Sequence, residues 1–171
     1  ADLENLEPPP NLDDQLRHLE RYLEASQGTG VGIISNLTSF FDSAMLAVGV
    51  YDSFFMFYDD RPFLEKLMDI LVEHQSKVMQ AVIDNFGDDI AFVMINDDIG
   101  YNSGLMIKED MFLEIFPHRM KQLIAPAKDK GKLVLMHTDG KLDNILPILH
   151  DVGIDINHPV EPESNELAEV K

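Results

Sequence analysis

The strongest constraint on the fold is an order of segments that recurs along the second half of the chain. A helical pattern ends at a glycine, a short apolar run follows, and polar residues close the run; the glycines are Gly87, Gly131 and Gly153. Ile90–Ile95 is the clearest apolar run and is typical of a strand buried on both faces. Helices that alternate with such strands predict an α/β fold in which helices cover a parallel sheet.

The rest of the chain extends this order, and we expect one domain over residues 1–171. An extended lead-in is expected over residues 1–11, because Pro8-Pro9-Pro10 excludes a helix there. An amphipathic helix follows over 12–26, and successive βα units occupy 31–171. The expected strands are 31–34, 90–95, 132–136 and 154–157, and the expected later helices are 38–48, 60–86, 108–130, 141–151 and one that begins at 164. Pro117 and Pro126 are expected to kink or break the helix over 108–130.

Composition excludes several classes of function. The 171-residue chain has 31 acidic and 13 basic side chains, a net charge of -18. This charge repels phosphate backbones and anionic lipids, so we expect no nucleic-acid and no membrane partner. The absence of cysteine excludes disulfides, thiolate zinc sites and a cysteine nucleophile. The acidic N-terminus has no signal-peptide pattern and no apolar run is long enough to cross a bilayer, which predicts a cytoplasmic protein.

Polar side chains capable of chemistry follow each expected strand. The carboxyl ends of parallel strands meet at one edge, where α/β proteins and β/α barrels bind their ligands. We therefore expect these side chains to form one site: Ser35, Asn36, Asp97, Asp98, His137, Asp139, His158 and Glu161. Taken singly, the aspartates also fit turns or helix caps. The glycine-rich segment 28–32 precedes a strand, so it does not predict a phosphate-binding loop.

An ordered series of motifs resembles the uroporphyrinogen decarboxylase superfamily, which also contains cobalamin-dependent methyltransferases. The matching segments are Asn96–Ile107, Phe116-Pro117, His137–Gly140, Gly153–Asp155 and His158–Pro162. The resemblance implies a (β/α)8 TIM barrel with its substrate cleft at the carboxyl ends of the strands. Such barrels need about 250 residues, and the motifs match the family's third to sixth strands, so we expect a partial barrel of about four βα units.

The resemblance implies a corrinoid-linked methyltransferase-type enzyme that acts on a small methylated substrate, with a corrinoid protein as a partner. A uroporphyrinogen decarboxylase-like lyase is one alternative. A non-catalytic half-barrel is another, and its two raw sheet edges would make it a homo-oligomer. The charge of -18 argues against an eight-carboxylate porphyrinogen as substrate, and the missing cysteines argue against thiol activation by zinc.

These hypotheses give the candidate residues their roles. Asp97, Asp98 and His137 are the expected catalytic groups, as acid–base or substrate-orienting side chains. The expected substrate-binding residues are Asn36, Tyr101, Asp139, His158 and Glu161. Residues two apart on an extended segment face the same way, so His137 and Asp139 can share a divalent metal, with Glu161 as a third ligand.

Overall fold

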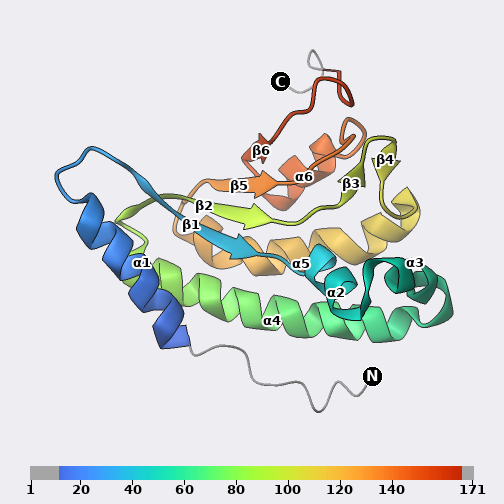
Figure 1. Cartoon of the computed structure of the whole chain (residues 1–171), viewed down its shortest axis with the longest axis horizontal. Coiled ribbons are helices and arrows are strands. Elements are labelled where there is room, and N and C mark those ends of the chain that lie inside the picture. Colours follow the sequence, from blue (N-terminus) through green and yellow to red (C-terminus); the bar gives the residue numbers. More distant parts are fainter. Residues whose placement is uncertain (1–11, 167–171) are drawn as a thin grey trace.

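Four parallel strands form the central sheet of the computed structural model, which describes residues 12–166 without the side chain of Gln15. Their order is β1-β2-β5-β6, and their bounds are Ile33–Thr38 (β1), Ile90–Asn96 (β2), Val134–His137 (β5) and Ile156–His158 (β6). The strand ends all point in one direction (Figure 1). This arrangement confirms the predicted α/β fold with a parallel sheet.

Helices cover one side of this sheet (Figure 1). The helices are α1 (Leu12–Ser26), α2 (Phe41–Val48), α3 (Val50–Asp59), α4 (Arg61–Phe86), α5 (Glu109–Asp129) and α6 (Leu146–Val152). The long helices α4 and α5 lie side by side against the sheet, and α2 and α3 lie beyond the carboxyl end of β1. A small antiparallel hairpin, β3 (Gly100–Tyr101) and β4 (Gly104–Leu105), follows β2. None of the described helices is both long and apolar enough to span a membrane.

The core lies between the sheet and these helices. Leu37, Val93 and Met136 point from three strands toward the helices and are buried. An aromatic cluster extends this core beyond the strands, and the rings of Phe112 and Phe116 stack with their centroids 4.7 Å apart. Aromatic pairs of this geometry add to the stability that burial alone gives. The core therefore fixes the positions of the strand ends, where the polar residues begin.

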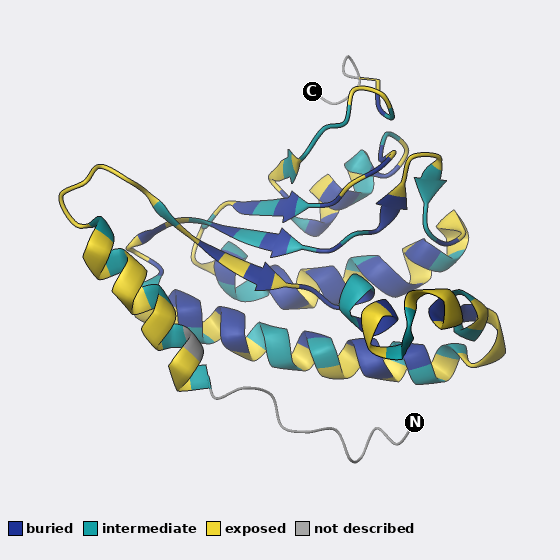
Figure 2. Cartoon of the chain, in the orientation of Figure 1, coloured by how far each residue is buried: buried dark blue, intermediate teal, exposed yellow. Residues whose placement is uncertain are grey.

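The other face of the sheet is open, which corrects the expectation that β2 is buried on both faces. Along β2 the side chains at Val93 and Ile95 are buried, whereas Met94 and Asn96 on the opposite face are only half-buried. The same alternation continues in β1 (Figure 2). No element within residues 12–166 covers this face.

Some element boundaries differ from the sequence expectations for identifiable reasons. β1 runs on through Thr38, because it pairs with β2 along Ser35↔Val93 to Thr38↔Asn96. α5 is continuous through Pro117 and Pro126, since its packing against α4 outweighs the lost hydrogen bonds. α6 begins only at Leu146, after a turn. Residues 164–166 form a turn and not the start of a helix, and the lead-in over 1–11 and residues 167–171 lie outside the described residues.

Candidate active site

One row of polar side chains crosses the open face at the carboxyl ends of the strands. The register pairs Thr38 with Asn96, Asn96 with His137, and His137 with His158. The two histidines contact each other through their Nδ1 atoms, 3.0 Å apart, so one ring donates and the other accepts. Asn96 also donates its amide N–H to the side-chain oxygen of Asn36. The row therefore presents imidazole and amide groups side by side above the sheet.

Two carboxylates stand beside His137 in the loops that follow β2 and β5. One potential ligand atom each of Asp98, His137 and Asp139 lies within 4.8 Å of the other two. The backbone N–H of Asp139 donates to Oδ1 of Asp98 at 3.3 Å, which holds the two loops together. We call Asp98, His137 and Asp139 the acidic triad. A cation or a proton-bearing heteroatom placed among these three groups meets a dense set of acceptors.

The loop carrying Asp139 is fixed by the segment after β6. Oε2 of Glu161 accepts the backbone N–H of Gly140 at 2.8 Å. Asn165 is buried and bridges the same loop: its oxygen accepts from Leu142 N and its amide N–H donates to Gly140 O, both at 2.8 Å. Buried polar groups that are satisfied in this way rigidify the backbone they hold. Glu161 therefore orients the loop and does not belong to the acidic triad.

Asp97 is fully buried and faces helix α2. Its Oδ1 accepts the backbone N–H of Asp42 at 2.8 Å, so it caps the N-terminus of α2. Burial and, after it, the nearby Asp42 carboxylate together raise the pKa of Asp97 to about 8, against the opposing effect of the hydrogen bond from the Asp42 backbone. The pKa of Asp42 is also raised, chiefly by burial, although its side-chain hydrogen bond with Asp97 lowers it. The pKa of each of these two carboxyl groups therefore lies above that of an ordinary aspartate.

The sequence of the chain matches a known family model. The model described as uroporphyrinogen decarboxylase (URO-D) covers residues 1–165. The chain belongs to the uroporphyrinogen decarboxylase family. No curated protein and no solved structure matches the chain significantly. The family's fold is a TIM barrel, and the four parallel strands with their outer helices are consistent with part of such a barrel, as expected from the sequence.

In this uroporphyrinogen decarboxylase family member, only some of the candidate site residues predicted from the sequence lie together. It brings together Asp98, His137, Asp139 and His158, and it places Asn36 beside them through Asn96. Ser35 is buried on the helix-facing side. Tyr101 is exposed on the β3–β4 hairpin, and its carbonyl accepts from Lys141 N at 3.0 Å. Sequence reasoning assigned no role to Asn96, Asp42 or Asn165; the position of Asn96 at the end of β2 was the one available signal.

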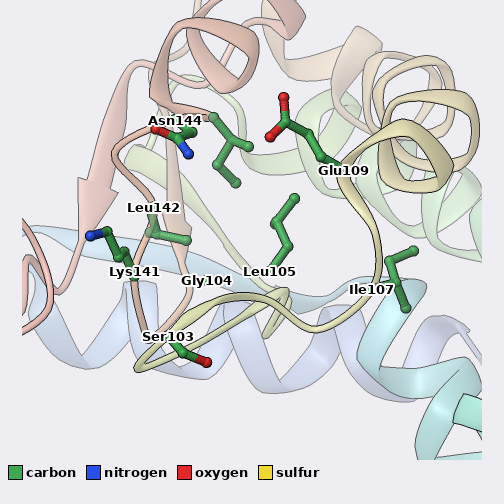
Figure 3. Close-up of a pocket in the computed structure, with 9 residues that line it drawn as sticks. Ser103, Gly104, Leu105, Ile107, Glu109, Lys141, Leu142 and Asn144 are labelled. Carbon is green, nitrogen blue, oxygen red and sulfur yellow. The ribbon is translucent and has the colours of Figure 1, made fainter.

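A separate pocket lies behind the hairpin (Figure 3). It has a volume of about 240 Å³ between β4, the start of α5 and the loop at residues 141–145. Leu105 and Leu142 supply apolar walls, and Glu109 and Asn144 supply polar groups. None of the acidic triad lines it, so this pocket is not the site at the strand ends.

Gly140 allows the hairpin to approach the site loop closely. Its φ is +96°, and a Cβ there would lie 2.6 Å from Tyr101 N. We expect Gly140→Ala to reduce the free energy of unfolding by about 2–4 kcal/mol, because both the backbone angle and the contact are violated. Gly131 is the matched control: its φ is +71° but open space surrounds it, so Gly131→Ala is expected to cost about 1 kcal/mol. Urea unfolding measures the free energy of unfolding of both variants. Equal losses of stability would contradict a role for the close approach between Gly140 and Tyr101.

The Asp97–Asp42 pair predicts a particular dependence of stability on pH. A folded pKa of about 8 lies above the ordinary value of 3.8, so the stabilisation is complete below pH 3.8 and is lost as pH rises through 8. Asp97→Asn keeps an acceptor oxygen for the Asp42 N–H but carries no charge. We expect this variant to lose less stability between pH 5 and pH 8 than the unaltered chain, by on the order of 1 kcal/mol or more. Identical pH profiles in denaturant titrations would contradict the raised pKa of Asp97.

Proposed function

We propose that this uroporphyrinogen decarboxylase family member is a methyltransferase-type enzyme whose active site is the acidic triad. The substrate is a small methylated alcohol, ether or amine, and the methyl acceptor is a corrinoid carried by a partner protein. The convergence of Asp98, His137 and Asp139 within 4.8 Å at the carboxyl ends of the strands is the observation that carries the proposal. The carboxyl edge is the catalytic face of β/α barrels.

The triad has donors suited to a divalent cation. One imidazole and two carboxylates form a nitrogen and oxygen ligand set, which suits Zn²⁺, Mn²⁺ or Fe²⁺ and does not require cysteine. The ligand atoms lie close enough together to surround one ion. Asp98, His137 and Asp139 would hold it, whereas the sequence hypothesis named Glu161 in place of Asp98. A cation bound there supplies Lewis-acid polarisation of the heteroatom that carries the methyl group.

The remaining polar residues bind and orient the substrate. When the methyl group passes to the acceptor, the C–X bond breaks and the leaving oxygen or nitrogen takes up a proton. His137 and His158 are hydrogen-bonded through their Nδ1 atoms at 3.0 Å, and in this proposal the imidazole pair is the group that supplies this proton. Asn96 and Asn36 hydrogen-bond to each other beside them and offer amide groups to a polar substrate. Glu161 fixes Gly140 and hence the loop that carries Asp139.

The charge of the site favours a small neutral or cationic substrate. The site side chains named above are carboxylates, amides and imidazoles, and none of them is lysine or arginine. A substrate with eight carboxylates would meet like charges here, within a chain of net charge -18. A methylated amine or a methoxylated compound meets complementary acceptors instead.

Direct methyl transfer tests this function. The chain is incubated with free cob(I)alamin as acceptor and, in turn, with methanol, methylamines and methoxybenzenes, while the corrinoid absorbance is followed. We expect methylation with at least one donor and its loss, by about 100-fold or more, in His137→Ala. His118→Ala, at an exposed position on α5, is the matched control and should retain the rate. Absence of transfer with every donor would count against the proposal.

Decarboxylation is the second candidate, and the paired histidines favour it. Loss of CO₂ leaves an electron pair on carbon, and in this second proposal the hydrogen-bonded pair of His137 and His158 supplies the proton that this carbon takes up. Incubation with uroporphyrinogen and with small carboxylic acids, followed by measurement of released CO₂, distinguishes the two reactions. CO₂ release that depends on His158 without methyl transfer would assign the chain to the lyase branch.

A further inference from the structure

Thr138 lies between two members of the acidic triad and is fully buried. It follows His137 at the end of β5 and precedes Asp139 in the loop. Its backbone N–H donates to the carbonyl of His158 at 2.9 Å, which ties the end of β5 to β6. Its side chain serves the other neighbouring strand, because Oγ1 accepts the backbone N–H of Ile99, in the loop after β2, at 3.1 Å. One residue therefore joins the ends of three strands.

The hydroxyl of Thr138 takes the place of a backbone acceptor where β2 and β5 part. The amide of Asp97 still donates to the carbonyl of His137 at 3.1 Å. In an unbroken parallel ladder the next amide on this side, that of Ile99, would donate to the carbonyl of Asp139. It donates to Oγ1 of Thr138 instead. The two backbones can thus diverge beyond this point without leaving a buried N–H unpaired.

This bond restrains the backbone on one side of Asp98. Asp97 before it is bound to β5 through its amide, and Ile99 after it is bound to Thr138. Ile99 is itself fully buried, and its carbonyl accepts the N–H of Met106 from the β3–β4 hairpin at 3.0 Å. Asp98 therefore has an anchored neighbour on each side, which limits the directions open to its side chain.

We propose that Thr138 is a positioning residue whose hydroxyl holds Asp98 in its place in the acidic triad. The bond to Ile99 fixes the loop that carries Asp98 relative to β5, which leads directly to the other two members. Threonine suits this position because its branched side chain has few rotamers. Valine has nearly the same shape but no acceptor, so the loop would have to move to pair the Ile99 N–H again. The inference rests on the proposed function, since it takes the acidic triad as the active site.

Amide hydrogen exchange of the full 171-residue chain, followed by NMR without added metal, tests the placement of the loop. The reporter is the Met106 N–H, which is bound to the carbonyl of Ile99. In Thr138→Val we expect it to exchange about tenfold faster or more, because the loop is released from β5. The reference is the Asp155 N–H, bound to the carbonyl of Val134 at the start of β5 at 2.9 Å, which should exchange at its original rate. An unchanged Met106 rate, or equal acceleration at both amides, would overturn the proposal.

Two further variants separate the hydroxyl from the side chain that carries it. Thr138→Ser keeps the acceptor, so we expect the Met106 exchange rate to return to within about threefold of the unaltered chain. Thr29→Val is the matched control: Oγ1 of Thr29 accepts the N–H of Val31 at the same 3.1 Å, but in an exposed turn after α1. It should leave the Met106 rate unchanged. Failure of the serine variant to restore the rate would contradict a role for the hydroxyl.

Titration calorimetry with Zn²⁺ or Mn²⁺ alone then tests the effect on the acidic triad. We expect Thr138→Val to weaken metal binding by about 10–100-fold, as for residues that support metal ligands, and Thr138→Ser to restore it to within about threefold. Thr29→Val should bind the metal as the unaltered chain does. Metal binding that is equally tight in Thr138→Val would overturn the positioning role and leave the proposed function standing. If the unaltered chain binds neither ion, the metal of the proposed function is wrong, and amide exchange decides the role of Thr138.

Discussion

Replacing His137 with alanine is expected to weaken binding of Zn²⁺ or Mn²⁺ by about 100-fold or more, because even residues that only support metal ligands contribute 10–100-fold. His137 supplies the one nitrogen donor of the acidic triad, whose ligand atoms lie within 4.8 Å of one another. Asp98→Asn and Asp139→Asn should also weaken binding, since each replaces a charged oxygen ligand with a neutral amide. Isothermal titration calorimetry with the metal alone measures all three effects.

Glu161→Gln is the variant that separates the two possible ligand sets. In the structure Glu161 accepts the backbone N–H of Gly140, and a glutamine oxygen can accept the same hydrogen bond. We therefore expect metal affinity within about threefold of the unaltered chain, in contrast to the effect at Asp98. A large loss of metal affinity in Glu161→Gln with none in Asp98→Asn would be the reverse pattern. It would favour the ligand set predicted from the sequence, which has Glu161 in place of Asp98. Unchanged affinity in His137→Ala would remove the metal site altogether.

Replacing Arg119 with methionine is expected to lower the free energy of unfolding by about 2–4 kcal/mol. Arg119 is 4% exposed and joins α5 to α4 by hydrogen bonds to Asp69 at 2.7 Å and to Glu65 at 3.2 Å. Methionine keeps the apolar stem but leaves both carboxylates without this partner. Asp69 is 61% exposed and regains water readily, so the loss should stay below that of a fully buried pair.

Lys77→Met is the control for this effect. Lys77 pairs with Glu73 on the same helix at 2.7 Å, but both side chains are exposed to water, so we expect a much smaller loss of stability than for Arg119→Met. The acid sensitivity of the two variants should differ as well. Burial raises the pKa of Glu65, but hydrogen bonds from Arg61 and Arg119 outweigh it and hold this pKa below its ordinary value of 4.5. The stabilisation is present above pH 4.5 and is lost on acidification, so Arg119→Met should show a shallower loss in acid. Similar urea midpoints for the two variants would contradict a role for the α4–α5 link.

The separation of Asp97 from Asp98 shows what sequence could and could not predict about the site. Their position after a strand predicted the correct edge of the sheet, because parallel strands place their carboxyl ends together. The two residues are adjacent in the chain, but their side chains point in different directions. The Asp97 side chain is buried and caps α2, whereas the Asp98 side chain lies near His137. No local pattern distinguishes these two neighbours. The residue that hydrogen-bonds to each of these aspartate side chains, and so fixes its direction, lies some 40 to 55 residues away in the chain.

The sequence by itself determined the alternation of helices and parallel strands, the edge that carries the polar residues, and the family. These depend on residue types at short spacing, and apolar periodicity with glycine-ended helices is enough to specify them. Only the tertiary structure decided which carboxylates gather around His137, that Glu161 and Asn165 hold the loop instead, and that one face of the sheet is open. Those features arise from strand register and from hydrogen bonds between loops that are distant in the sequence. Such contacts form only in the folded chain, and no short sequence pattern predicts them.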